Sequence, residues 1–284
     1  MGTDDTSQVP LGSASLARRL GAANGAGMAD CARCWAADHP ESDLIGVELA
    51  GGWIIAGDGV SPLARAVGLG LGAPLDDQSL DTLESIFIER GQKPRIDVSA
   101  YADPALMKTL AERGYKPSEF KGVNARRLGP NDPIDHASPG EGAEGVEITR
   151  VDRHDQDTVD RLVDVMSRAF NPDPPDWLVR VTRQGVKQPS AEVFAARVDG
   201  DLAGGGCLCV VDKVGMLYSG GVLERHRRRG VQSALIRGRL MWARDRGADV
   251  AGITSIPGGP TERNARRAGF SLVDTQIVMT REDT

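Results

Sequence analysis

The segment from Gly215 to Arg246 constrains the fold more than any other part of the chain. Its first nine residues are mostly small or apolar and predict a strand that ends at Leu223. A short loop with three consecutive arginines follows, and apolar residues at helical spacing then predict a helix from Gly230 to Arg246. A strand that passes directly into a helix in this way is typical of a mixed α/β layer.

The same alternation of strands and helices continues through the chain. We expect strands at 44–49, 53–56, 66–71, 95–98, 119–128, 146–151, 191–198, 202–211, 215–223, 250–256 and 272–280. We expect helices at 13–37, 76–90, 104–113, 157–170, 177–184, 230–246 and 262–268. The predicted fold class is therefore α/β with a mixed sheet.

Residues 131–145 are rich in Pro, Gly and acidic residues, which is the composition of a linker. They separate a first domain at 1–130 from a second at 146–284, and each is long enough to bury a core. Both domains end with Pro, a short helix, Gly, an aromatic residue and a strand, at Pro104–Tyr115 and Pro260–Phe270. This echo indicates two copies of one fold, although the same pattern is also a common helix–strand connection.

Charge and composition exclude several partners. The 284 residues carry a net charge of −6, which disfavours duplex DNA, and only 4% are aromatic, which disfavours stacking on single strands. No run of about 18 apolar residues is present, and no leader pattern precedes the first helix. We expect a cytoplasmic protein that binds neither nucleic acid nor membrane.

Four cysteines form two close pairs, Cys31 with Cys34 and Cys207 with Cys209. Two such pairs could make a four-thiolate zinc site. They fall in a predicted helix and a predicted strand without histidines at ligand spacing, so we interpret them as buried free thiols and expect no metal.

The loop between Val222 and Leu235 has the composition of an anion site. The first turn of a helix offers unpaired N–H groups and the positive end of the helix dipole. Gly230 lets the backbone approach a ligand, and the arginines 227–229 add positive charge. This pattern favours a phosphate or pyrophosphate. A solvated basic turn that only caps the helix is the alternative.

This stretch resembles motif A of the GNAT superfamily of N-acetyltransferases, which is Arg/Gln-x-x-Gly-x-Gly/Ala between a strand and a helix. Here the pattern runs from Arg227 through Gly230. The segment Pro260–Phe270, a short helix that ends in Gly-Phe, is similar to the family's motif B. The resemblance implies two tandem GNAT-like domains, of which the first is degenerate, and acetyl-CoA as the cofactor.

The resemblance also implies which residues bind acetyl-CoA, because loop and helix amides hold its pyrophosphate in the family and motif B lies near its adenosine end. The implied set is Val222, Leu223, Arg227, Arg228, Arg229, Gly230, Val231, Gln232, Ser233, Asn264 and Arg267. A solvent-facing charge is the alternative for Arg267. Gln232 departs from the motif, although its backbone N–H can still donate. Ala265 stands where many members carry a Tyr that protonates the CoA thiolate.

The implied chemistry is direct attack of an amine on the thioester. A backbone N–H near Val222 would polarise the carbonyl. Asp212 and Glu224 are candidates for a base, and Tyr218 for an acid. The alternatives are surface charges for the two carboxylates and a packing role for Tyr218. We expect His226, which lies among arginines, to be neutral.

Residues between the first two helices of the second domain are where GNAT enzymes shape the acceptor pocket. Asp173, Asp176 and Trp177 are the candidates there, and Asp173 and Asp176 could attract a cationic amine. Turn residues are the alternative. The first hypothesis is an N-acetyltransferase for a small-molecule amine. A CoA-binding sensor without turnover and a protein N-acetyltransferase, whose acidic first domain docks basic tails, are the other two.

The first domain contains a second match to the pattern, Arg65-Ala-Val-Gly68-Leu-Gly70. Gly72 and Pro74 follow and disfavour a helix at once, so the amides of a helix start are not expected there. We therefore predict no working CoA site in the first domain.

Overall fold

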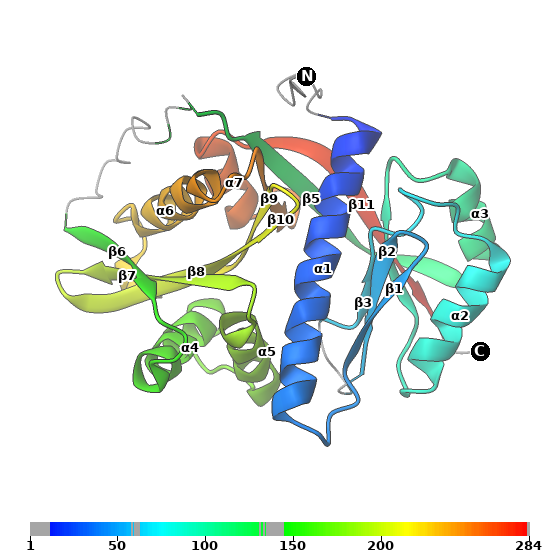
Figure 1. Ribbon diagram of the computed structural model, residues 1–284, viewed down its shortest axis with the longest axis horizontal. Coiled ribbons are helices and arrows are strands. Elements are labelled where there is room, and N and C mark those ends of the chain that lie inside the picture. The colour runs from blue at the N-terminus through cyan, green and yellow to red at the C-terminus, as the bar shows by residue number, and fades with distance from the viewer. Residues whose placement is uncertain are drawn as a thin grey trace. The chain divides into compact units, whose positions relative to one another are not determined.

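The computed structural model describes residues 12–57, 59, 63–130, 132, 134 and 145–282. The contacts divide the chain into two compact units. Figure 1 labels the helices and strands from which they are built. The first takes the residues up to 125, 254–262 and those from 271 on, and the second takes 126–253 and 263–270. Each unit is built on strands of both directions with helices on both faces, so the predicted mixed α/β class is confirmed.

The first unit contains three helices and six strands among its described residues. The helices are α1 (Ala14–Asp38), α2 (Asp77–Ile88) and α3 (Pro104–Glu112). The strands are β1 (Ile45–Leu49), β2 (Gly52–Ala56), β3 (Arg65–Val67), β4 (Arg95–Ser99), β5 (Tyr115–Arg127) and β11 (Ser271–Arg281). They lie in the order β1-β2-β3-β4-β11-β5, and the β3–β4 pair is parallel while the others are antiparallel.

Side-chain alternation in these strands determines which helix covers which face. Ile54 and Ala56 of β2 pack with α2 and α3, whereas Ile55 between them packs with α1. The helix α1 lies very close to its strands, because a Cβ on Gly46 would be only 2.7 Å from the Cα of Ala29. Glycine is thus required there by backbone-to-backbone packing.

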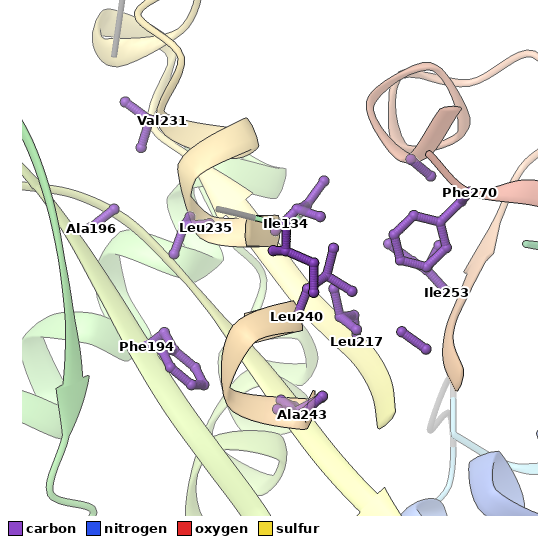
Figure 2. Close-up of a cluster of buried hydrophobic side chains, with 14 of the residues drawn as sticks. Ile134, Phe194, Ala196, Leu217, Val231, Leu235, Leu240, Ala243, Ile253 and Phe270 are labelled. Carbon is purple, nitrogen blue, oxygen red and sulfur yellow. The ribbon is translucent and has the colours of Figure 1, made fainter. Parts of the chain in front are cut away.

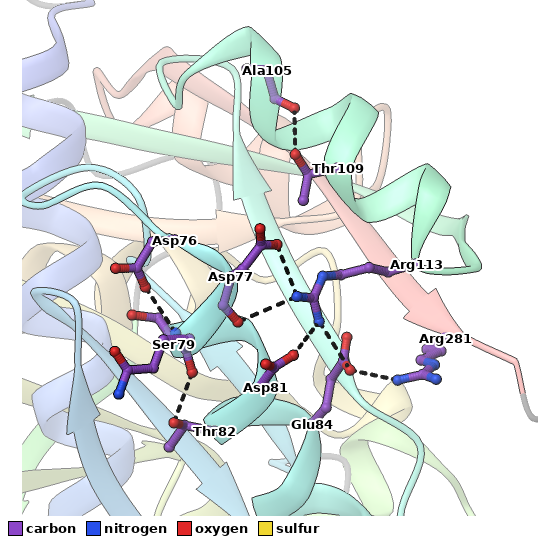
Figure 3. A network of polar contacts seen from close by, with 11 residues as sticks. Asp76, Asp77, Ser79, Asp81, Thr82, Glu84, Ala105, Thr109, Arg113 and Arg281 are labelled. Atoms are coloured by element: carbon purple, nitrogen blue, oxygen red, sulfur yellow. Dashed lines mark hydrogen bonds and ion pairs between the residues drawn. The ribbon is translucent and has the colours of Figure 1, made fainter.

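The strand β11 comes from the end of the chain and pairs with β4 on one side and β5 on the other. Its Arg281 donates from Nη1 to Oε2 of Glu84 in α2 at 2.6 Å, and Arg113 donates to the same oxygen at 3.3 Å (Figure 3). The last strand of the predicted second domain therefore belongs to the first compact unit. Strand periodicity could not indicate this, because it identifies a strand but not its neighbours.

The second unit has five strands in its described part, namely β6 (Val146–Val151), β7 (Ala191–Val198), β8 (Asp201–Val211), β9 (Val214–Val222) and β10 (Val250–Ser255). They follow the order β10-β9-β8-β7-β6, with β9 and β10 parallel and the other pairs antiparallel. The helices α4 (Gln156–Phe170) and α5 (Asp176–Lys187) cover one face. The other face carries α6 (Val231–Asp245) and α7 (Pro260–Arg267), as Figure 1 shows.

The larger core of this unit lies under α6 (Figure 2). Val231, Leu235 and Leu240 of α6 pack against Phe194 of β7 and Leu217 of β9. Each such side chain contributes roughly 1.5–3 kcal/mol when fully buried. This packing fixes the start of α6 relative to the end of β9, which is where the candidate site lies.

Each predicted helix and strand is present, with ends that differ by four residues at most. Most of the predicted linker at 131–145 lies outside the described residues. At its start, however, Ile134 is buried in the core beneath α6, and Asp132 accepts a hydrogen bond from Arg126. None of the described helices combines the length and the apolar character needed to cross a bilayer.

Candidate functional site

An irregularity in β9 shapes the site. Two residues of this strand, Ser219 and Gly220, lie opposite the single residue Gly206 of β8. Ser219 has a φ of 49°, a left-handed conformation that is unfavourable for a residue other than glycine. A β-bulge of this kind bends the strand and interrupts its ladder.

The ladder between β9 and β10 also ends at the bulge. Among the described residues it joins Val214–Leu217 to Val250–Ile253, whereas β9 continues to Val222. The peptide groups of Tyr218–Val222 on that side are therefore outside the parallel ladder. Strand peptide groups without a neighbouring strand are hydrogen-bonding partners for an extended ligand.

The loop after β9 leads into the start of α6. A short 3-10 turn, Glu224–His226, follows Leu223, and Gly230 then precedes the helix with a φ of 74°. In the part of the chain that the structure describes, no side chain caps this helix, so the N–H groups of Val231, Gln232 and Ser233 have no side-chain capping partner there. An uncapped helix start with a positive dipole end, reached through a glycine, can hold a phosphate group.

The three arginines of the loop have different roles in the structure. Arg227 donates from Nη2 to the carbonyl of Ala169 at 2.9 Å and from Nε to that of Val222 at 3.2 Å, so it braces the loop against α4. Arg229 forms an ion pair of 2.8 Å with Asp199. Arg228 is exposed, with a φ of 63°. Among the three, Arg228 is the side chain best placed to meet an anion from solvent.

His226 lies buried beneath this loop, and Arg225 donates from Nε to its Nε2 at 3.2 Å. Burial lowers the pKa of His226, and the charges of Arg225 and Arg229 lower it further. The imidazole is therefore neutral at pH 7, as the sequence predicts.

The loop after β9 and the helix α6 lie within a segment that matches a protein-family model. Residues 159–270 match the family model described as "Acetyltransferase (GNAT) family". The chain carries a GNAT acetyltransferase domain. The resemblance noted in the sequence and the predicted enzyme class, an N-acetyltransferase, are thus confirmed.

Several solved structures share the fold. A GCN5-related N-acetyltransferase from Kribbella flavida is 20% identical with a TM-score of 0.63, covering 95% of this chain and 96% of that one. A GCN5-related N-acetyltransferase from Sphaerobacter thermophilus is 16% identical, with a TM-score of 0.57 and coverage of 85% and 76%. A tandem GNAT protein from the clavulanic acid biosynthesis pathway is 13% identical, with a TM-score of 0.58 and coverage of 86% and 85%. No curated protein matches the chain.

The three catalytic candidates lie apart from one another in the GNAT domain. Asp212 is exposed in the β8–β9 hairpin turn, eight residues from Gly220, or roughly 26 Å along an extended strand. This separation argues against a role for Asp212 as the base. Glu224 is exposed in the loop itself. Tyr218 is half-buried beside the bulge, and its hydroxyl donates to the carbonyl of Gly185 at 3.1 Å.

The motif B residues lie on α7. Asn264 accepts a hydrogen bond of 3.1 Å from Arg267, whose side chain is exposed. Ala265 is 0% exposed and packs in the same core as Phe270. The position where many GNAT enzymes have a Tyr is therefore filled by a small core residue.

The acceptor candidates lie at the start of α5. Asp173, Asp176 and Trp177 are all exposed, and the backbone N–H of Asp173 donates to Asn171. Phe170, at the end of α4, is exposed as well. Among the described residues no group of His, Cys, Asp and Glu side chains is arranged to hold a metal ion.

Two features of the domain escaped the sequence analysis. The bulge was hidden because Gly215–Leu223 has the composition of one continuous strand. The sequence does not predict the burial of Arg239, because a charged residue in a helix is rarely buried, yet Arg239 is 0% exposed. The signal for both was the pair of glycine runs in β8 and β9, Gly204–Gly206 and Gly220–Gly221.

Proposed function

We propose that this protein transfers an acetyl group from acetyl-CoA to an amine of a small molecule. The observation that carries the proposal is the helix start at Gly230. Gly230 has a left-handed conformation, and among the described residues no side chain caps α6, so the first-turn amides of this helix are left without a side-chain partner. These groups fit a pyrophosphate, and the part of β9 beyond its ladder with β10 fits the extended chain that would continue from it.

The loop after β9, the start of α6 and the end of β9 each have a role in this proposal. The amides of Val231, Gln232 and Ser233 hold the pyrophosphate, Arg228 adds charge, and Arg227 keeps the loop in place. The peptide groups of β9 between the bulge and Val222 orient the thioester arm. Bound acetyl-CoA supplies an acetyl thioester, from which an amine forms an amide and releases a thiol.

Exposed residues beside α5 are proposed to bind the acceptor. The carboxylates of Asp173 and Asp176 attract a protonated amine, and the exposed rings of Phe170 and Trp177 offer it an apolar surface. Glu224 is the carboxylate of the loop that can accept a proton from the amine. Tyr218 directly precedes the bulge in sequence, and its hydroxyl must exchange its partner Gly185 to act as an acid.

Calorimetric titration with acetyl-CoA, followed by thiol release in the presence of an amine panel, tests the proposal. We expect saturable binding and thiol release that depends on one class of amine. Asp176→Asn should raise the KM for that amine and leave acetyl-CoA binding unchanged, with Asp212→Asn as the control. No binding of acetyl-CoA would overturn the proposal.

A CoA-binding sensor without turnover is the second candidate. It is favoured by Ala265, because the aromatic acid of many relatives is replaced by a core residue that cannot reach a thiolate. Saturable binding without thiol release from any amine would support the sensor. Acetyl-lysine blots of basic proteins incubated with the enzyme separate the remaining alternative, a protein N-acetyltransferase.

A further inference from the structure

The buried cation beneath the bulge has no role in the site described so far. Arg239 of α6 is 0% exposed, and its guanidinium lies against the backbones of β8 and β9. Nε donates to the carbonyl of Leu235 at 3.0 Å, and Nη1 donates to those of Cys207 at 3.2 Å and Tyr218 at 3.3 Å. Nη2 is buried and has no hydrogen-bond partner among the described residues.

Two glycines make room for this guanidinium. A Cβ on Gly206 would be 2.8 Å from Nη1 and 2.9 Å from Cζ of Arg239. A Cβ on Gly220 would be 3.1 Å from Nη2, and 3.3 Å from Nε2 of Gln232. Both glycines belong to the bulge, so the bulge and the arginine occupy one site together.

The charge of Arg239 is not neutralised by an acid. No carboxylate in the described part of the chain forms an ion pair with it, and its three acceptors are all backbone carbonyls. Burial lowers the pKa of Arg239 to about 10, so the guanidinium is still charged at pH 7. An uncompensated buried charge is costly for stability, and such groups are characteristic of functional sites.

The hydrogen bond to Tyr218 connects this charge to the bulge. The accepting carbonyl belongs to the same peptide group as the N–H of Ser219, the residue with the left-handed φ. A cation that bonds to the carbonyl of a peptide makes the N–H of that peptide a stronger donor. Arg239 also joins Cys207 and Tyr218, which are register partners, and so fixes the two strands beside the bulge.

We propose that Arg239 is a positioning residue for acyl transfer: it fixes the bulge of β9 and polarises, through the Tyr218–Ser219 peptide, the carbonyl of a thioester bound there. This inference rests on the proposed function, because it requires acetyl-CoA to lie along β9. It assigns to a buried cation part of the electrostatic assistance that preorganised donors give to acyl transfer.

Infrared difference spectra of acetyl-CoA labelled with ¹³C at the thioester carbonyl test this inference on the full chain, without an acceptor. In the wild type we expect the bound carbonyl band to move to lower frequency. Arg239→Met should lose at least half of that shift, while the calorimetric Kd for acetyl-CoA changes by no more than about threefold. Arg239→Lys should restore part of the shift. Arg237→Met, on the same helix, is the control and should match the wild type.

Gly206→Ala keeps the arginine but displaces its guanidinium, so it should reduce the shift even if Arg239→Met does not fold. A wild-type protein that does not bind acetyl-CoA would overturn the proposed function and this inference together. Binding with a full band shift in both Arg239→Met and Gly206→Ala would overturn this inference alone.

Discussion

The two Arg-x-x-Gly segments of the chain have the same glycine conformation but different surroundings. Gly68 has a φ of 73° and Gly230 a φ of 74°. After Gly230 the helix α6 begins at once, whereas after Gly68 the chain turns and the next helix starts only at Asp77. That later helix is capped, because Asp76 accepts from the N–H of Ser79 at 2.9 Å.

The arginines and the space beside the glycines differ as well. Arg227 donates hydrogen bonds to the backbone carbonyls of Val222 and of Ala169 in α4. Arg65 instead forms an ion pair with Asp97 of the first unit at 3.7 Å. A Cβ on Gly68 would be 3.2 Å from the backbone of Gly21, so α1 covers that face. We therefore expect an anion site only where an uncapped helix follows the glycine pattern, as it does after Gly230.

The largest expected effect comes from proline at the two glycines. Gly230→Pro forces φ to about −65° and removes the conformation that opens α6, so acetyl-CoA affinity should fall by at least about 100-fold. Gly68→Pro should lower the melting temperature but leave the affinity unchanged. Calorimetry with circular dichroism as the folding check measures both. Equal losses of affinity in the two folded variants would contradict the distinction between the segments.

The next effect concerns the close packing of α1 in the first unit. Gly46→Ala places a methyl group against the backbone of Ala29, so stability should fall by about 1–3 kcal/mol in denaturant unfolding. Gly72→Ala is the matched control, because its Cβ would meet the side chain of Arg18 at an ordinary 3.6 Å. Neither change should alter acetyl-CoA binding. A higher Kd for acetyl-CoA in Gly46→Ala would contradict this by showing that the first unit contributes to binding.

Removing the side chain of Arg227, which fixes the loop after β9, should have a smaller effect on acetyl-CoA binding. Arg227→Ala loses two hydrogen bonds from a charged donor, and we expect about tenfold weaker binding of acetyl-CoA. Arg65→Ala is the counterpart in the first unit and should change stability only. If Arg65→Ala weakened binding as much as Arg227→Ala, the two arginines would not differ in function.

The smallest effect is a pH dependence of stability that belongs to the loop of the second unit. The pKa of His226 is lowered by burial, so the unfolded chain takes up a proton more readily than the folded one. The contribution of neutral His226 to the stability of the fold is present above a pH of about 6.5 and is lost as the pH falls below that value. In His226→Gln the melting temperature should change less with pH between about 7 and about 5.5 than it does in the wild type. His154→Gln, at an exposed histidine, should retain the wild-type slope.

The helices and strands were predictable because periodicity, glycines and prolines mark them locally. The loop proposed to bind an anion was recognisable for the same reason, since Gly230 and the arginines are adjacent in sequence. Features that depend on partners distant in sequence were not. The pairing of β11 with β4 and β5 and the burial of Arg239 between α6 and β9 are of this kind. The position of Asp212 relative to the bulge was also not predictable, because nearness in sequence along a strand is not nearness in space.

The central claim is that acetyl-CoA binds at the start of α6 and not at the matching segment of the first unit. Backbone amide resonances of the ¹⁵N-labelled protein, followed during titration with acetyl-CoA, test it most directly. We predict the largest shifts at Val231, Gln232 and Ser233, with Gly68, Leu69 and Gly70 unchanged. Shifts concentrated at Gly68–Gly70, or none at Val231–Ser233 in a saturated sample, would contradict the account.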